Sequence, residues 1–261
     1  MRAALVTGAG RGIGAATVAA LCEQGYGVAA LDACAGGDVP PGVGYPLATP
    51  GDLDAVADRF PGQVVPLEGD VRDLETLQAA VNTTMVHFGR LDAVVAAAGV
   101  VVGGLPQWET PHQHLRTLID VNVLGVWNTA TATIPTMLAS PDRSGCRFVA
   151  LASAAGERGL PHLTGYTASK HAVIGIVRGL AADLVGTGVT AVAIAPGSTR
   201  TTMLASTADL YRTTPDNLAG SQGIGRLIEP EEVAATIALC CSPAGAVLNG
   251  SVIRADGGVT G

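Results

Sequence analysis

The sequence predicts an α/β fold, with one domain built on a doubly wound parallel sheet of about seven strands and helices on both faces. Short apolar runs alternate with longer amphipathic stretches along the whole chain, as βαβ units require. The apolar runs are nearly continuous in Val, Ile, Ala and Leu, which is typical of strands buried on both sides. Because the chain has no repeat, linker or change in composition, we expect a single domain over residues 1–261.

Seven segments have the length and composition of buried strands. They are residues 3–7, 27–31, 64–67, 93–98, 147–152, 190–195 and 251–255. The stretches between them with helical periodicity are residues 13–24, 74–88, 114–139, 167–186 and 231–241. The last of these follows Pro230 and begins with two acidic residues, both of which favour a helix N-terminus.

Two connections are longer than ordinary turns. Residues 33–62 join the second and third strands, with only a short helical piece near residues 53–59. Residues 198–226 follow the sixth strand and have no place in the sheet. Long irregular connections are usually functional, and both follow carboxyl ends of strands, where open α/β sheets bind ligands. We therefore expect an insertion-like loop at 33–62 and a substrate lid at 198–226.

The composition limits the partners of the chain. The formal net charge is −7 and no basic stripe is present, so nucleic acid is not an expected partner. Only 14% of the residues are charged, which suggests that copies of the chain cover part of one another in a homo-oligomer.

The sequence also predicts a cytoplasmic location. No stretch of about 18 residues is apolar without interruption, so we expect no membrane span. The first residues enter a strand-like run without a charged leader or cleavage site. The five cysteines show no CxxC spacing and are interpreted as reduced thiols. No metal site is predicted.

A glycine-rich loop joins the first strand to the first helix. Residues 7–14 read TGAGRGIG and include Gly8, Arg11, Gly12, Ile13 and Gly14. The glycines let the backbone turn sharply and approach a pyrophosphate, which then lies at the helix N-terminus. A plain tight turn is the alternative for such a loop read alone. Its position at the first strand–helix junction favours a dinucleotide site on a Rossmann-type fold.

Asp32 closes the second strand, 18 residues after Gly14. A carboxylate there can accept hydrogen bonds from the adenosine ribose and repels a 2′-phosphate, which favours NAD over NADP. An Asp that only caps the loop is the alternative. Arg11 is a weak counter-indication, since a cation in this loop could hold a phosphate.

Two further pairs of residues follow strands at the same edge. Asp70 and Val71 come after the third strand and are placed to meet the adenine. Ala98 and Gly99 end the fourth strand, where we expect the ribose. Ordinary turn chemistry explains either pair equally well when it is read alone.

Tyr166 and Lys170 lie four residues apart and therefore share one face of a helix. A free tyrosine has a pKa of about 10 and is a poor base at neutral pH. A nearby ammonium and an oxidised nicotinamide favour the phenolate, and lowering the pKa to 7 needs roughly 4 kcal/mol. Lys170 is the single lysine beside 14 arginines. The pair is predicted to be a general acid/base, with a surface ion-pair position as the alternative.

Two polar residues complete the predicted catalytic set. Ser153 follows the fifth strand, 13 residues before Tyr166, and its hydroxyl can bond the substrate oxygen. Asn122 interrupts an otherwise apolar helical stretch and needs partners if buried. A water leading to Lys170 is one such partner, and a purely structural Asn is the alternative.

Together these residues resemble the short-chain dehydrogenase/reductase family over essentially the whole chain. The family pattern TGxxxGxG falls on residues 7–14, and its Asn-Ser-Tyr-Lys tetrad falls on Asn122, Ser153, Tyr166 and Lys170. The resemblance implies cofactor contacts from the positions that match the family's pattern. These are Gly8, Arg11, Gly12, Ile13, Gly14, Asp32, Asp70, Val71, Ala98, Gly99, Tyr166, Lys170, Pro196, Gly197, Thr199 and Thr201. It also implies a homotetramer packed through the Asn122 and Tyr166 helices.

The chain departs from the family pattern at two places. The usual Asn-Asn-Ala-Gly is Ala96-Ala97-Ala98-Gly99 here, and the connection from Asp32 to Asp70 is longer than the family norm. With Trp127-Asn128, these features are similar to the branch coupled to the redox cofactor mycofactocin. In that branch the insertion covers NAD, which does not exchange and needs an external electron acceptor.

The resulting hypothesis is hydride transfer between NAD(H) and a secondary alcohol or ketone. Apolar residues near the predicted site indicate a terpenoid or alicyclic substrate; they are Val101, Val102, Leu105, Leu160, Met203 and Leu204. Arg158, Arg200 and Arg212 leave room for an acidic group. The alternatives are an NADPH-dependent 3-ketoacyl reductase and a non-catalytic NAD(H)-binding redox sensor.

Overall fold

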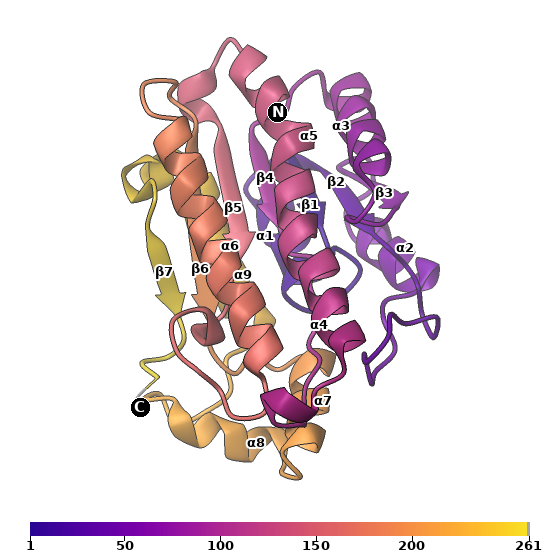
Figure 1. The fold of residues 1–261 in the computed structure, drawn as a ribbon. Coiled ribbons are helices and arrows are strands. Elements are labelled where there is room, and N and C mark those ends of the chain that lie inside the picture. Colours follow the sequence, from indigo (N-terminus) through magenta and orange to yellow (C-terminus); the bar gives the residue numbers. More distant parts are fainter. Residues whose placement is uncertain (260–261) are drawn as a thin grey trace.

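Seven parallel strands form a single sheet in the order β3-β2-β1-β4-β5-β6-β7 (Figure 1). This is a computed structural model, and it describes residues 1–259. The strands are β1 Arg2–Thr7, β2 Tyr26–Asp32, β3 Val64–Glu68, β4 Ala93–Ala96, β5 Arg147–Leu151, β6 Thr190–Pro196 and β7 Val252–Ala255. The strand order reverses between β1 and β4, so a crevice opens at their carboxyl ends. The predicted doubly wound α/β fold is confirmed.

Helices cover both faces of the sheet. They are α1 Gly12–Glu23, α2 Pro50–Asp58, α3 Leu74–Phe88, α4 His112–Leu118, α5 Gly125–Ala139, α6 Thr164–Asp183, α7 Thr202–Leu210, α8 Pro215–Leu218 and α9 Pro230–Cys241. Buried side chains of α1, α2 and α9 pack on one face, as Leu21, Leu53 and Ile237 do. Those of α3, α5 and α6 pack on the other, as Leu77 and Val177 do. The five inner strands are almost wholly buried, which explains their unbroken apolar runs, whereas the edge strands β3 and β7 are partly exposed.

The long helix predicted at residues 114–139 is interrupted. A π-helical segment, Ile119–Leu124, separates α4 from α5. Periodicity alone does not reveal one inserted residue in an otherwise helical run. Such π segments often occur at functional sites, and this one carries Asn122.

The lid predicted as an irregular connection is partly helical. Thr201 caps α7 by accepting a hydrogen bond from the Leu204 amide, and Thr214 caps α8 in the same way through Asn217. Threonine is a favoured N-cap residue, so these two threonines are the sequence signal for the short helices that the prediction missed. In Figure 1, α7 and α8 lie at the end of the sheet toward which the strands point.

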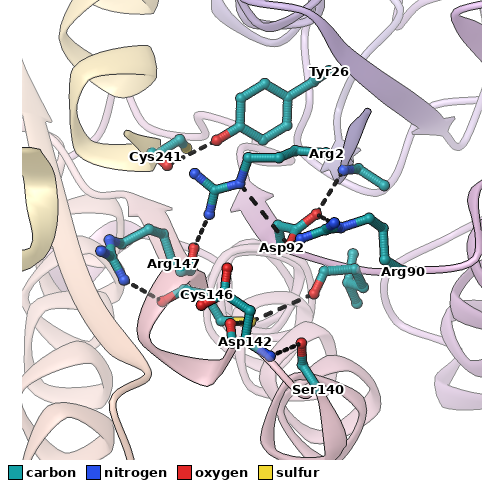
Figure 2. A network of polar contacts seen from close by, with 12 residues as sticks. Arg2, Tyr26, Arg90, Asp92, Ser140, Asp142, Cys146, Arg147 and Cys241 are labelled. Atoms are coloured by element: carbon teal, nitrogen blue, oxygen red, sulfur yellow. Dashed lines mark hydrogen bonds and ion pairs between the residues drawn. The ribbon is translucent and has the colours of Figure 1, made fainter. Parts of the chain in front are cut away.

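A buried polar network closes the opposite end of the sheet (Figure 2). Asp92 is fully buried, accepts a hydrogen bond from the Ala3 amide at 2.8 Å, and forms two bonds of 2.6 Å with Arg90. The Tyr26 hydroxyl donates to the Cys241 carbonyl at 2.9 Å, which ties β2 to the end of α9. This network belongs to the scaffold, because it lies at the amino ends of β1 and β4.

The five cysteines are free in the structure. None of the five forms a disulfide, and all are buried except Cys34, which is half-buried. None of the helices within residues 1–259 is long and apolar enough to cross a membrane.

Candidate active site

One cavity of about 380 Å³ lies at the carboxyl edge of the sheet. Every predicted cofactor residue lines it: Gly8, Arg11, Gly12, Ile13, Gly14, Asp32, Asp70, Val71, Ala98, Gly99, Tyr166, Lys170, Pro196, Gly197, Thr199 and Thr201. Ser153 lines the same cavity, whereas Asn122 does not. Residues from six separate connections therefore meet at one place, as the switch point of an open α/β sheet requires.

The glycine-rich loop forms a cradle that no larger residue would fit. Gly8 and Gly12 have φ values of +67° and +56°, a region that favours glycine. A Cβ on Gly14 would lie 1.9 Å from the Gly8 carbonyl oxygen. Arg11 gives α1 no side-chain cap, so the first amides of the helix remain for an anion. The loop fits the pyrophosphate of a dinucleotide.

Asp32 holds its loop by hydrogen bonds and also lines the cavity. Its two carboxylate oxygens accept hydrogen bonds from the Gly10 amide at 2.9 Å and the Cys34 amide at 3.1 Å. The carboxylate is thus held in place on the cavity wall, so the loop-capping alternative and the cofactor prediction are compatible. A fixed negative charge here opposes a 2′-phosphate.

Asp70 carries its own counter-ion. Burial alone would raise the pKa of Asp70, but hydrogen bonds from Arg72 outweigh burial and hold the pKa below its usual range. The Arg72 guanidinium donates to Asp70 at 2.8 and 2.5 Å. Asp70 therefore stays ionised and fixed beside the cavity.

The unusual Ala-Ala-Ala-Gly segment is supported from β1. The Thr7 hydroxyl accepts hydrogen bonds from the Ala97 and Ala98 amides, each at 3.2 Å. Gly99 lies where a Cβ would come within 3.4 Å of both Asn122 Oδ1 and Lys170 Nζ. The segment thus keeps its place without the two asparagines of the family pattern.

Asn122 is fully buried, and its side-chain amide is hydrogen-bonded to other residues of the protein. Its Oδ1 accepts from the Val100 amide at 2.8 Å, and its Nδ2 donates to the Val100 carbonyl at 2.9 Å and to Ser169 Oγ at 3.0 Å. These bonds join the end of β4 to α6. They favour the structural alternative for the side chain; its role in holding a relay water remains a prediction.

Tyr166 and Lys170 meet as predicted, in the first two turns of α6. The Lys170 Nζ lies 5.8 Å from the centre of the Tyr166 ring and donates to the Leu151 carbonyl at 2.8 Å. Both side chains are buried and both line the cavity. Ser153 reaches the same place as the cap of a 3₁₀ turn, Ala154–Gly156, and forms a hydrogen bond with Tyr166.

Burial shifts the pKa values of both groups of the pair. Burial raises the pKa of Tyr166, although the hydrogen bond with Ser153 lowers it in part. Burial also lowers the pKa of Lys170 to about 8. The sequence prediction relied on an ammonium together with an oxidised nicotinamide in a dry site. The dry site by itself shifts both pKa values toward the neutral forms, so the predicted lowering of the tyrosine pKa depends on the added positive charge of the nicotinamide.

The insertion-like loop contributes to the site, and the sequence prediction named none of its side chains. Residues 36–48, here called the strap, cross the cleft between the Asp32 loop and α4. Pro40, Tyr45, Leu47 and Ala48 line the cavity. A single tyrosine inside a long connection at a switch point is the signal that could have identified Tyr45.

The substrate walls were predicted only in part. Val101, Leu160, Met203 and Leu204 line the cavity, as does Arg158. The residues that do not line it are Val102, Leu105, Arg200 and Arg212. Val102 faces an apolar cluster, and Arg200 pairs with Glu229 at 2.9 Å. Tyr211, just after α7, belongs to the predicted lid and also lines the cavity. Leu163, just before α6, is a wall residue that the sequence did not predict.

The sequence of the chain is similar to those of known oxidoreductases. A family model described as enoyl-(acyl carrier protein) reductase matches residues 8–260. A (-)-trans-carveol dehydrogenase from Rhodococcus erythropolis is 38% identical over 187 residues, which are 69% of this chain and just under two thirds (65%) of that protein. A 2,5-dichloro-2,5-cyclohexadiene-1,4-diol dehydrogenase from Sphingobium indicum is 33% identical over 98% of this chain and 96% of its own length.

A solved structure gives the same result at the level of the fold. The carveol dehydrogenase from Mycobacterium avium in complex with NAD has a TM-score of 0.92 and 29% identity, covering 98% of this chain and 96% of that one. The family model spans nearly the whole chain, and the Sphingobium relative exceeds 30% identity over 96% of its length. The chain belongs to the short-chain dehydrogenase/reductase family.

Proposed function

We propose that this protein is an NAD-dependent alcohol dehydrogenase or ketone reductase acting on an apolar, alicyclic secondary alcohol. One observation carries the proposal: Ser153 and the buried pair Tyr166 and Lys170 line the same cavity as the glycine cradle. A reactive phenol beside a dinucleotide site suits proton transfer coupled to hydride transfer.

The glycine loop, Asp32 and the ends of β4 and β6 would hold the cofactor. NAD when bound supplies a hydride acceptor and a positive charge beside the phenol. Tyr166 exchanges the proton with the substrate oxygen, and Ser153 orients that oxygen by its hydrogen bond. Lys170 stays mostly protonated at neutral pH, because its pKa is about 8, and this positive charge favours the phenolate.

The cavity wall and the relatives support the substrate class. Val101, Leu160, Leu163 and Met203 offer an apolar surface, which suits a hydrocarbon ring better than a sugar or a phosphorylated compound. The two curated relatives are named for carveol and for a cyclohexadiene diol, both of which are alicyclic alcohols.

We also propose that the bound NAD is retained and is re-oxidised through mycofactocin. The strap, which crosses the cleft and lines it, supports this proposal. NAD bound beneath the strap could exchange with NAD in solution only after the strap opens. Asp32 opposes the alternative of an NADPH-dependent ketoacyl reductase, and the buried Tyr166 opposes a non-catalytic sensor.

A homotetramer remains part of the proposal. Leu115, Leu124 and Trp127 are 40–59% exposed along α4, the π segment and α5. Exposed apolar side chains on neighbouring turns suit a contact between copies of the chain. Light scattering of the eluted protein should give four chains, and a monomer at micromolar concentration would contradict this.

The test of the function uses the purified protein without added cofactor. Native mass spectrometry should find one NAD per chain that survives dilution. Addition of an alicyclic secondary alcohol should then produce absorbance at 340 nm in a single turnover, followed by repeated turnover once an artificial electron acceptor is added. Absence of NAD reduction across a panel of such alcohols, with NAD supplied in excess, would contradict the proposed reaction. Rapid turnover on freely exchanging NAD would contradict retention alone.

A further inference from the structure

The strap belongs to the same apolar cluster as the substrate side of the cavity. Val43 and Tyr45 are 6% and 7% exposed, and they pack with Val101, Leu163 and Tyr166. The strap therefore contributes to the wall that faces the reacting alcohol as well as crossing the cofactor cleft.

Tyr45 is fixed from two sides. Its hydroxyl accepts a hydrogen bond from the Val101 amide at 3.0 Å. The Arg11 guanidinium lies over its ring, 5.9 Å from the centre, and also donates to the Pro46 carbonyl. These contacts reach opposite walls of the cleft, so the Tyr45 ring has a defined position between them.

The strap itself is tied at both ends. At its base the Gly36 amide donates to the Ala48 carbonyl at 2.9 Å, and the Leu47 amide donates to the Gly36 carbonyl at 2.7 Å. At its tip the Thr117 hydroxyl donates to the Pro41 carbonyl at 2.9 Å. Tyr45 is thus carried by a braced segment, as a residue that selects a substrate must be.

The Tyr45 hydroxyl has one hydrogen still to donate. Its oxygen accepts from Val101, and within residues 1–259 no acceptor takes its hydrogen. Tyr45 lines the cavity together with Tyr166. Burial raises its pKa to about 12, so the hydroxyl keeps its proton at neutral pH. A buried donor that faces a cavity is satisfied when a ligand brings an acceptor.

We propose that Tyr45 determines specificity by donating a hydrogen bond to a second oxygen of the substrate. This rests on the proposed function, in which Tyr166 and Ser153 bind the reacting oxygen. The substrate class is then an alicyclic alcohol that carries another oxygen, such as a diol or hydroxyketone. The diol named for the Sphingobium relative has this chemistry.

The test compares trans-1,4-cyclohexanediol with cyclohexanol on Tyr45→Phe. This variant keeps the ring and removes the hydroxyl. The ratio of kcat/KM for the diol to that for cyclohexanol should fall about tenfold, since a hydrogen bond to a substrate hydroxyl discriminates strongly against its loss. Tyr26→Phe is the matched control, because it also removes a buried hydroxyl bonded to the backbone, at the far end of the sheet. Its ratio should equal that of the wild type.

A wild-type ratio in Tyr45→Phe would overturn the assignment of Tyr45. If kcat/KM falls equally for both alcohols, the hydroxyl only supports Val101. If the ratio is unchanged and NADH release is faster, the hydroxyl serves the cofactor. Thermal melting of both variants checks that they fold. A wild-type enzyme that oxidises neither alcohol and no other ring alcohol would instead refute the proposed function.

Discussion

Lys170 lies one helical turn after Tyr166, with its Nζ 5.8 Å from the centre of the tyrosine ring and with both side chains removed from solvent. Their shared burial has opposite effects on the two groups. It raises the pKa of the phenol and lowers that of the ammonium to about 8, because each charged form loses hydration. At neutral pH the phenol therefore keeps its proton and the ammonium, with a pKa of about 8, is still largely charged, so that a further positive charge brought by a ligand would favour the phenolate.

Tyr166→Phe should remove the proton-transfer group and leave the cavity intact. We expect turnover to fall by about 10²–10⁴-fold, the usual contribution of a general acid/base. Binding of NADH, followed by its fluorescence, should stay within about twofold, because the cradle and Asp32 are unchanged. Activity close to that of Tyr26→Phe would show that Tyr166 is not the proton carrier.

Lys170→Met should increase stability while it abolishes activity. The pKa of Lys170 is about 8 in the folded protein instead of 10.5. While the folded form carries the charge, this difference corresponds to roughly 3 kcal/mol of lost folding stability. The variant also loses the hydrogen bond from Lys170 to the Leu151 carbonyl, which makes its gain in stability smaller. The gain of the variant should be full below pH 8. It should shrink as the pH rises toward 10.5, because only the unfolded chain still binds the proton in that range. Urea unfolding at pH 7 and pH 10 measures this, and equal gains at the two values would contradict the buried-ammonium interpretation.

Asp32→Asn should change the cofactor preference. The substitution keeps the size of the side chain and removes the charge that opposes a 2′-phosphate. The Kd of NADPH relative to that of NADH should fall about tenfold or more. Asp58→Asn, at the exposed end of α2, is the control and should leave the ratio unchanged. An unchanged ratio in Asp32→Asn would mean that the carboxylate only caps its loop.

Asp92→Asn should destabilise the protein without affecting the chemistry. The new side-chain amide keeps only one acceptor oxygen for Arg90 and the Ala3 amide and loses the charge, and a buried hydrogen-bond partner left unsatisfied costs about 1–3 kcal/mol. The midpoint of urea unfolding should therefore fall, while kcat/KM stays within about twofold because the network lies at the far end of the sheet. A large loss of activity in the folded variant would contradict the assignment of this network to the scaffold.

The fold and the two main parts of the site were predictable because each depends on a short pattern in the sequence. Unbroken apolar runs predicted the strands, since both faces of the sheet are covered. The glycine loop and the Tyr166–Lys170 spacing predicted two parts of one site, since a parallel sheet brings the ends of its strands to one edge. The interruption of the helix at Asn122 escaped the prediction, because one extra residue hardly changes the helical period.

Sequence alone thus determined the sheet, the position of the glycine-rich loop and the placing of Tyr166 and Lys170 on one helix face, because each depends on residues close together in the chain. Tertiary structure decided the rest. It placed Tyr45 against Val101, selected which apolar residues face the cavity, and removed water from Tyr166 and Lys170. These outcomes depend on contacts between segments far apart in the sequence, and on burial that only the packed chain creates.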